Sequence, residues 1–434
     1  MKKTINSFLK FHVLFCIALC LPSAAQTKKN TMAFINGIAH IGNGTIIESC
    51  LITVKNNTIE SVQSSIGIRL DYKSFDTVIN LEGKHIYPAL INANNVLGLH
   101  DAFSVRATRD MQDVGNINPH IRALIAYSTD NKIIPTIKTN GILYTQVTPR
   151  GGLISGASSI LALEGWNWED AVLKEDDGIH LNYPEYIIRS GEDVDDKEMK
   201  RYQDRLNELE LFIKDAFAYY NSKDITEKNI RFEAMKGVFS GAKKLYIHAE
   251  RAKDILSAIA LSKNYAIKFP VLVGARECAK TLKEIKLSGI PVMLARVHDL
   301  PDKADDDIDA IYKLPAMLQK EGVLFCLQTA GDMEMEAMNS RNLPFLAGSA
   351  VAYGLTKEEA LTSITLNTAK IMGIDKQIGS IEEGKLASIV VSNGDILDMK
   401  TSNITHAFIA GKPVNLMNQQ TELYLKYKTK YGLK

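Results

Sequence analysis

The stretch KLYIHAERAKDILSAIALSKNYAIKFPVLVGA, residues 244–275, has the pattern of a strand, a helix and a second strand in succession. Its two ends, residues 244–250 and 269–275, are short and almost continuously apolar, as in strands that are covered on both faces. Residues 250–264 between them form a helical segment. This order predicts two parallel strands joined by a crossover helix.

The same alternation continues on both sides of this stretch. Further buried-strand runs occupy residues 141–149, 291–297 and 322–331, and helical segments occupy residues 276–289 and 309–322. A repeating order of strand, helix and strand over roughly 280 residues favours a (β/α)8 barrel of the TIM type. An open, doubly wound sheet is the alternative architecture.

One segment interrupts the repeat. Residues 195–220 are charged, and their apolar side chains recur at helical spacing. This pattern predicts an amphipathic helix, inserted over one face of the barrel.

Both ends of the chain have a different pattern. Short alternating runs broken by Asn and Gly lie at residues 33–47, 50–62 and 76–88, and similar runs lie at residues 378–397 and 404–416. Such runs indicate strands joined by tight turns. We therefore expect one small composite β-sandwich that is assembled from both termini.

The first residues have the pattern of an export leader. Lysines precede an apolar run at residues 11–21, and the small residues 23–25 follow where a signal peptidase would cut. The run is too short to remain as a membrane span, so we expect a periplasmic or secreted protein. The expected division of the chain is a signal peptide (1–25), the N-terminal part of the sandwich (26–87), the barrel (88–374), and the C-terminal part of the sandwich with a tail (375–434).

Composition and charge exclude several classes of protein. The chain is 46% hydrophobic and 23% charged, which is ordinary for a globular protein. Three of its 51 basic residues lie in the leader, against 50 acidic residues, so the mature charge is about −2 and predicts no nucleic-acid partner. Three cysteines remain after removal of the leader, namely Cys50, Cys278 and Cys326. Their odd number and wide spacing do not indicate a disulfide framework. A Cys278–Cys326 disulfide is not expected, because both lie in apolar, core-like segments.

Several stretches together resemble the amidohydrolase superfamily, in particular secreted members of its imidazolonepropionase-like branch. The resemblance covers nearly the whole mature chain. It rests on INGIAHIGNG (35–44), GKHIYPALINANNVLGL (83–99), IHAERAKDIL (247–256), LTKEEALTSITLNTAKIMGI (355–374) and IGSIEEGKLASIVV (378–391). It implies a barrel whose strand ends hold one or two divalent metals, zinc by default, where a metal-bound water attacks a C–N bond.

The metal-binding positions that the resemblance implies are mostly replaced. An aspartate and two histidines are expected at the first strand, where Asn92, Asn94 and Val96 stand. His248 is kept at the fifth strand. Val273, followed by Gly274, replaces the histidine of the sixth strand, and Ala330 replaces the aspartate of the eighth. Zinc needs about three nitrogen, sulfur or carboxylate ligands, so no metal is expected here.

Three side chains remain as candidates for catalysis. His248 and Glu250 lie two residues apart at one strand end, so both can face the same side. A salt bridge from Glu250 to Arg251 or Lys253 is the alternative. Asp332, two residues past Ala330, could act as a general base, or it could cap a helix.

Candidates for substrate binding lie at the first two strands. Asn92 and Asn94 offer amide groups, and Arg150 lies in the Gly-rich stretch 148–157, where its guanidinium and the backbone could hold a carboxylate. A plain flexible loop is the alternative for this stretch. The pair His100 and Asp101 could supply ligands only if the strand end were rearranged.

Two function hypotheses follow. The favoured one is a pseudoenzyme, non-catalytic or weakly active, that binds a small ligand at the barrel mouth or pairs with an active homologue. The second is a hydrolase of carbon–nitrogen bonds in cyclic amide-like substrates, with an unusual site around His248. A homo-oligomer is compatible with either hypothesis.

Overall fold

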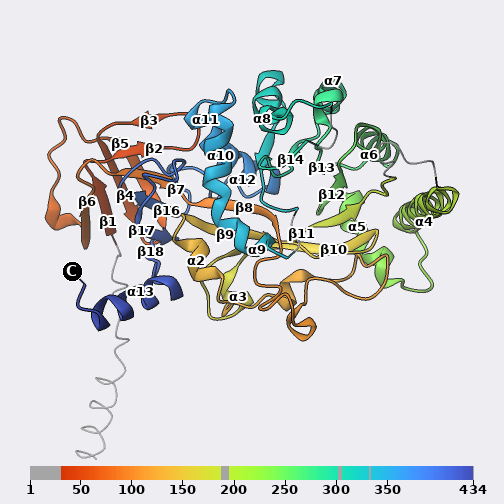
Figure 1. The fold of residues 1–434 in the computed structure, drawn as a ribbon, viewed down its shortest axis with the longest axis horizontal. Coiled ribbons are helices and arrows are strands. Elements are labelled where there is room, and N and C mark those ends of the chain that lie inside the picture. The colour runs from red at the N-terminus through yellow and green to blue at the C-terminus, as the bar shows by residue number, and fades with distance from the viewer. Residues whose placement is uncertain (1–30, 187–194, 302–304, 332–333, 434) are drawn as a thin grey trace, which may run out of the picture.

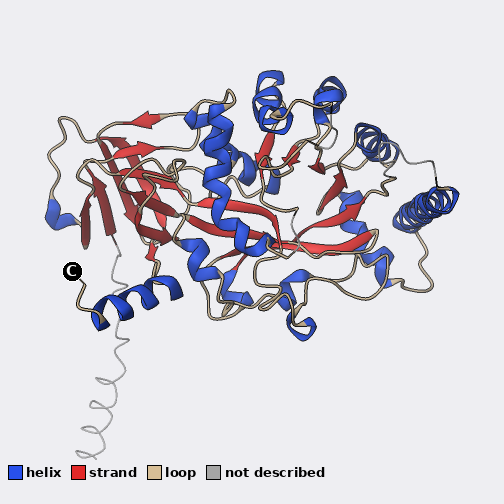
Figure 2. Ribbon diagram, viewed as in Figure 1, coloured by secondary structure: helices blue, strands red, loops and turns tan. Residues whose placement is uncertain are grey.

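The structure is a computed structural model that describes residues 31–186, 195–301, 305–331 and 334–433. It consists of a β-sandwich at one end and a barrel with surrounding helices beside it (Figures 1 and 2). The expected signal peptide, residues 1–25, and the candidate base Asp332 lie outside the described residues. Within the described part of the chain, no helix is both long and apolar enough to cross a membrane.

The barrel is one eight-stranded sheet in sequence order. A bridge between Ala93 and Gln328 joins its first and last strands, so the barrel is nearly closed. The strands are β8 (Leu90–Asn95), β9 (Ile142–Val147), β10 (Ile154–Ala162), β11 (Val172–Asn182), β12 (Lys244–Ala249), β13 (Pro270–Gly274), β14 (Val292–Leu294) and β15 (Phe325–Leu327). The predicted (β/α)8-type barrel with a β-sandwich is therefore confirmed.

One strand departs from the regular parallel pattern. β10 runs antiparallel to both β9 and β11, whereas the other neighbouring pairs of this sheet are parallel. Its start lies in the Gly-rich stretch 148–157, for which strand structure was not expected. β10 is rich in Gly, Ala and Ser and β11 carries charges in its middle, so neither gives the β-branched signal of a buried strand.

Helices follow or flank the later strands on the outside of the barrel. They are α6 (Ala252–Asn264), α7 (Leu282–Ser288), α8 (Ala310–Glu321), α10 (Leu343–Ala352), α11 (Lys357–Ser363) and α12 (Leu366–Met372). Shorter helices are α2 (Ile134–Lys138), α3 (Trp168–Ala171) and α9 (Glu336–Asn339), and α13 (Gln419–Lys430) lies near the C-terminus. The predicted segments 250–264 and 309–322 match α6 and α8.

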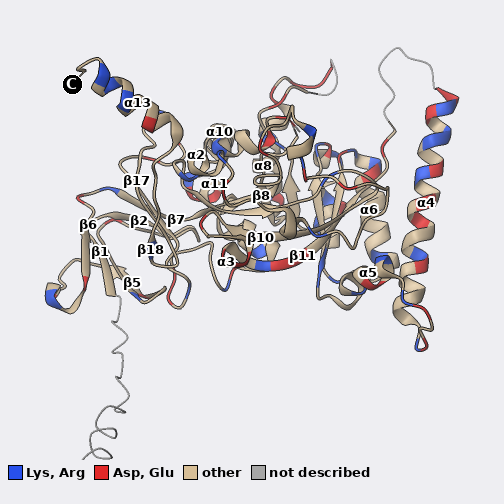
Figure 3. Ribbon diagram, turned by 90° about the horizontal axis from the view of Figure 1, so that it is seen from below, with Lys and Arg blue, Asp and Glu red and all other residues tan. Residues whose placement is uncertain are grey.

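The predicted insertion is the long helix α4 (Asp196–Asn221), which packs against α5 (Ile230–Ser240). Basic and acidic residues recur along the length of α4 (Figure 3). Leu209, Ile213 and Ala216 form its buried stripe, and the Asp195 carboxylate caps its first turn. The amphipathic spacing thus predicted this helix to within one residue at each end.

The sandwich consists of two sheets. The first has the order β5-β4-β1-β6 and the second the order β18-β17-β16-β7-β2-β3, so strands from both ends of the chain share the second sheet. The strands are β1 (Thr31–Ile35), β2 (Ile38–His40), β3 (Ile46–Ile47), β4 (Cys50–Lys55), β5 (Thr58–Ser64), β6 (Thr77–Asn80), β7 (His85–Pro88), β16 (Ile389–Ser392), β17 (Ile404–Ile409) and β18 (Lys412–Pro413). Phe34 and Phe408 meet edge to face across the core, with ring centroids 5.2 Å apart.

Candidate functional site

A cavity of about 340 Å³ lies at the barrel mouth, where the parallel strands β8 and β12 to β15 end. The carboxyl ends of barrel strands are where enzymes of this architecture place their active sites. The lining side chains come from these strand ends and from the loops that follow them. They are Asn94, Arg150, His248, Glu250, Val273, Arg276, Ala295, Arg296, Asp299, Gln328, Ala330, Gly331 and Glu336.

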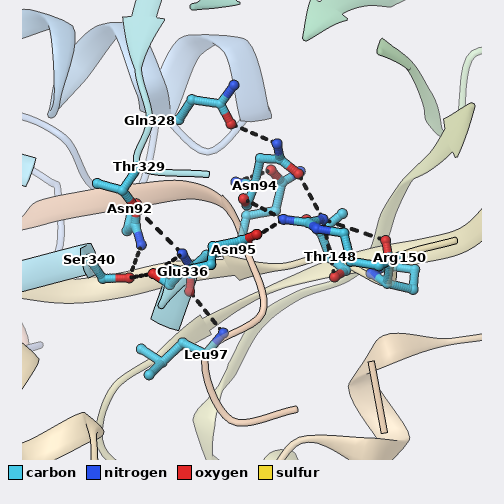
Figure 4. Close-up of polar contacts among 12 residues, drawn as sticks. Asn92, Asn94, Asn95, Leu97, Thr148, Arg150, Gln328, Thr329, Glu336 and Ser340 are labelled. Carbon is cyan, nitrogen blue, oxygen red and sulfur yellow. Dashed lines mark hydrogen bonds and ion pairs between the residues drawn. The ribbon is translucent and has the colours of Figure 1, made fainter. Parts of the chain in front are cut away.

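The guanidinium of Arg150 is the central contact of this mouth (Figure 4). Its Nη1 donates to the Asn94 side-chain oxygen at 3.0 Å, and its Nη2 donates to the Asn94 carbonyl at 2.9 Å. Nη2 also pairs with the carboxylate of Glu336, whose side chain is 2% exposed. A buried carboxylate and two amide oxygens thus hold the cation in one orientation.

The backbone at Asn94 explains how its side chain reaches Arg150. Asn94 has a φ of 48°, in the left-handed region that asparagine tolerates better than most residues. Its backbone N–H donates to the Gln146 side-chain oxygen at 3.0 Å, and its side-chain nitrogen donates to the Gln328 oxygen at 2.6 Å. Every polar group of Asn94 therefore takes part in a protein hydrogen bond.

His248 is paired with a second histidine, His180 from β11. Nε2 of His248 and Nδ1 of His180 lie 2.9 Å apart, so one ring donates and the other accepts. Burial, and then the charge of Arg150, lowers the pKa of His248 to about 3. Burial also lowers the pKa of His180 well below its ordinary value, with His248 and Arg150 adding to the shift. Both rings are therefore neutral at pH 7.

A buried carboxyl group lies beneath the histidine pair. Asp177 accepts hydrogen bonds from Ser158 at 2.6 Å, from the Tyr246 hydroxyl at 2.5 Å and from the Gln146 amide at 3.1 Å. The His180 ring stacks on Tyr246 at 4.5 Å. Burial raises the pKa of Asp177, while the hydrogen bonds from Ser158 and Tyr246 oppose the rise. This network fills the barrel interior below the cavity.

The far wall of the cavity presents two more arginines. Arg276 donates to Asp299 at 2.8 Å, whereas Arg296 approaches the same carboxylate only at 3.5 Å. The buried Nε of Arg296 has no hydrogen-bond partner among the described residues. Glu250 accepts from the backbone N–H of Arg276 at 3.2 Å. Arg296 therefore has one unsatisfied donor, which is buried in the wall of the cavity.

The structure brings most of the predicted site residues together. Asn94, Arg150, His248 and Glu250 all line the cavity, as do Val273 and Ala330 at the replaced metal positions. The stretch around Arg150 is thus part of the mouth.

Other predicted residues do not reach the cavity. Asn92 lies among buried side chains, where it donates to the Ser340 hydroxyl at 2.8 Å, and Val96 belongs to the hydrophobic core. His100 is buried with its carbonyl bonded to the Asn131 side chain, which also bonds Asp101. His100 and Asp101 do not line the cavity.

The neighbours suggested for Glu250 have other contacts. Arg251 pairs with Glu185 at 2.6 Å, and the Lys253 ammonium lies 4.6 Å from the centroid of the Tyr202 ring. The carboxylate of Glu250 instead lies beside Gly274, at the end of β13.

Sequence reasoning missed His180, Arg296 and Glu336. His180 follows Ile179 in GIHLN as His248 follows Ile247 in YIHAE, but the charged residues 174–177 before it hide the strand signal. Glu336 lies in a helix after the last strand and Arg296 in a loop, and no residue pattern places either at the mouth.

The donor set of this mouth does not fit a divalent metal. The described residues contain no cluster of three or more His, Cys, Asp or Glu side chains that could hold one. His248 and Asn94 already bond to His180, Arg150 and Gln328, and the guanidinium brings a positive charge that would repel a metal ion. The mouth therefore lacks a set of ligands for a catalytic metal ion.

Comparisons with known proteins agree with this fold. The model of the amidohydrolase family matches residues 203–414. The structure is similar to an amidohydrolase from Thermotoga maritima, with 23% identity, a TM-score of 0.73, and coverage of 88% of this chain and 99% of that chain. It also resembles a Xaa-Pro dipeptidase with bound methionine, with 14% identity, a TM-score of 0.54, and coverage of 89% and 100%.

A third similar structure is the ochratoxinase of A. niger, with 13% identity, a TM-score of 0.54, and coverage of 89% of this chain and 95% of that chain. Comparison with curated proteins finds no match. Residues 203–414 thus match the amidohydrolase family, and the barrel with its two-ended sandwich has the fold of a solved amidohydrolase.

Proposed function

We propose that this protein is a metal-independent amidohydrolase homologue that binds a small polar ligand at the barrel mouth and does not hydrolyse it. The observation that carries the proposal is the position of Arg150, whose guanidinium is bonded to Asn94 and Glu336 inside the cavity. The resemblance implies a metal ligand at Asn94. In this structure, the permanently charged guanidinium of Arg150 donates hydrogen bonds to Asn94 instead.

A guanidinium supplies positive charge but not the chemistry of a hydrolytic metal. It keeps its protons in proteins and cannot bind a water molecule as a ligand to convert it into hydroxide. His248, with a pKa of about 3, is a weak base at neutral pH. Ala330 stands where the resemblance implies a general base. These features together favour binding without turnover.

The cavity favours a small ligand with an oxygen acceptor. A volume of about 340 Å³ is near the lower end of the range for small-molecule sites. Arg276 and Arg296 line the cavity, and their positive charge favours a carboxylate or carbonyl oxygen. With the leader that residues 1–25 predict, the proposed location is the periplasm or the exterior. Pairing with an active homologue remains part of this proposal.

Metal analysis tests the first half of the proposal. Protein purified without a chelator should contain well below one equivalent of zinc, manganese or iron by mass spectrometry. Its melting temperature should be unchanged by zinc or by EDTA. About one equivalent of tightly held metal would contradict the proposal.

Ligand binding tests the second half. N-acetylglycine carries a carboxylate and an amide, and its methyl ester is a neutral control. The acid should raise the melting temperature of the protein more than the ester, and Arg296→Met should remove the difference. Equal effects of acid and ester would rule out recognition of the carboxylate.

The hydrolase alternative rests on one observation, which is that His248 and Glu250 line the same cavity. Under that alternative, cleavage of cyclic amides such as hydantoins or lactams should be measurable and should be lost in His248→Ala. We expect no cleavage above the rate of a protein-free control.

A further inference from the structure

A second and larger hollow, of about 740 Å³, lies at the opposite end of the barrel. It opens where β12 and β13 begin, between the C-terminal ends of α6, α7 and α12. Helices α6 and α7 follow one another around this part of the barrel (Figure 1). Lys244 lines this hollow, and His248 lines the mouth four residues later on the same strand, roughly 13 Å away. The two sites are therefore distinct. We call this hollow the basal groove.

The basal groove has an apolar wall. Ile267, Ile290 and Ile371 are buried at its sides, while Phe269 and Leu287 remain 51% and 88% exposed. Single exposed apolar side chains are ordinary, but here two large ones border a concave surface with apolar residues beneath them. Such a wall gains free energy when a hydrocarbon covers it.

The same groove is rich in lysines. Lys244, Lys263, Lys268 and Lys370 line it, against a single acidic residue, Glu284. Lys268 donates to the Ser240 carbonyl at 3.0 Å. Within the described part of the chain, no carboxylate forms a salt bridge with Lys244, Lys263 or Lys370. The groove therefore offers positive charge to an anion.

Part of this charge has a structural role. Lys263 and Lys370 lie in the last turns of α6 and α12, where lysines complement the helix dipole. Lys244 begins a strand and has no such role. Its ammonium is partly buried beside the Phe269 ring, at 5.4 Å from the centroid.

Lys244 also lies close to another cation. A Cβ added at Gly373 would be 3.0 Å from the Lys244 ammonium and 3.3 Å from that of Lys174, which bonds to the Met372 carbonyl. Burial, and then Lys174, lowers the pKa of Lys244, although Asp177 and Asp375 oppose the shift. An anion next to Lys244 would relieve this crowding of like charges.

We propose that the basal groove binds a single-chain fatty acid, with its carboxylate at Lys244 and its hydrocarbon chain along the wall of Phe269, Leu287 and Ile290. A volume of about 740 Å³ is within the range of small-molecule sites. A concave apolar wall with a cationic side matches a molecule that has one charged end. This binding is independent of the function proposed for the barrel mouth.

Calorimetric titration of the full-length protein with decanoate tests the proposal. We expect one equivalent, tighter binding than octanoate by roughly tenfold for the two additional methylenes, and much weaker binding of decanol. Lys244→Met keeps most of the length of the side chain but removes its charge, and it should weaken decanoate binding at least about tenfold. Lys283→Met changes an exposed lysine of α7 that does not line the groove, and it should bind like the wild type.

Further variants keep the test decisive if Lys244→Met does not fold. Lys370→Met should weaken decanoate binding, and Ser288→Trp should block it by filling the groove. Arg296→Met, at the barrel mouth, should leave it unchanged, which separates this site from the first.

Three results would overturn the proposal. They are the absence of decanoate binding, equal affinity for decanol, and several weak equivalents that no groove variant alters. Binding of phosphatidylglycerol vesicles without binding of monomeric decanoate would identify a membrane surface instead and would also overturn it.

Discussion

At the scale of single residues, Arg150 determines the character of the barrel mouth. Its side chain is 14% exposed and that of its partner Glu336 is 2% exposed, so both charges have lost most of their water. A charge pair in such a place is retained only if each partner compensates the other. The same cation acts on His248, where it adds to the effect of burial in lowering the pKa.

Replacement of Arg150 by methionine should therefore destabilise the protein. We expect a loss of about 3 kcal/mol in the free energy of unfolding, because Glu336 keeps its buried charge without this guanidinium. The pKa of His248 should rise, since Arg150 is one of the two causes that lower it. Urea denaturation and NMR titration of the histidine measure these effects.

The double variant Arg150→Met, Glu336→Gln is the matched control. It removes both charges, so it should recover part of the lost stability. If the single and double variants are equally unstable, the ion pair is not the source of the loss.

At the scale of elements, the end of β13 shows how the barrel mouth differs from the metal site that the resemblance implies. Gly274 has a φ of 93°, and a Cβ there would meet the Glu250 carboxylate at 2.2 Å. The resemblance implies a histidine at Val273, beside this glycine. Gly274 has no side chain at the end of β13. The side chain of Glu250, which follows the neighbouring strand β12, occupies the space that this leaves.

Gly274→Ala should consequently be more harmful than an alanine at another left-handed glycine. Gly289 has a φ of 68° and no atom within 4 Å of an added Cβ, so Gly289→Ala should cost only about 1 kcal/mol of backbone strain. Gly274→Ala also displaces the Glu250 carboxylate, which accepts from the Arg276 N–H, and should cost about 1 kcal/mol more. Thermal unfolding of both variants measures the difference, and equal melting temperatures would contradict the close contact.

At the scale of the whole molecule, the neutral histidine pair links stability to pH. The pKa of His248 is about 3 in the folded protein and 6.5 in a model peptide. Between these values the unfolded chain binds a proton that the folded protein does not. The free energy of unfolding therefore falls as the pH falls through this window, and the contribution of His248 is fully present above it.

Comparison with His248→Gln isolates this contribution. Between pH 7.5 and 5, the wild type should lose about 2 kcal/mol more than the variant, because a group that titrates near 6.5 only in the unfolded chain has this effect. Denaturant titrations at several pH values provide the measurement. Parallel pH profiles of the two proteins would show that His248 does not carry the linkage.

The sequence determined the main elements of the fold, because burial on both faces leaves a local signal. The runs at 244–250, 269–275 and 322–331 became β12, β13 and β15, and the amphipathic residues 195–220 became α4. The alternating runs at both termini became one sandwich. The replacement of ligand residues at Asn94, Val273 and Ala330 could also be read directly, since a missing donor atom is a property of the residue itself.

Only the tertiary structure decided which side chains pair with one another at the barrel mouth. The pairing of Arg150 with Glu336 joins residues 186 positions apart, and that of His180 with His248 joins residues 68 positions apart. Neither contact follows from a periodic pattern, because side chains at the ends of different strands meet only when the sheet closes. The antiparallel β10 was hidden for a related reason: its small residues become a strand through pairing with β9 and β11 and have little strand preference of their own.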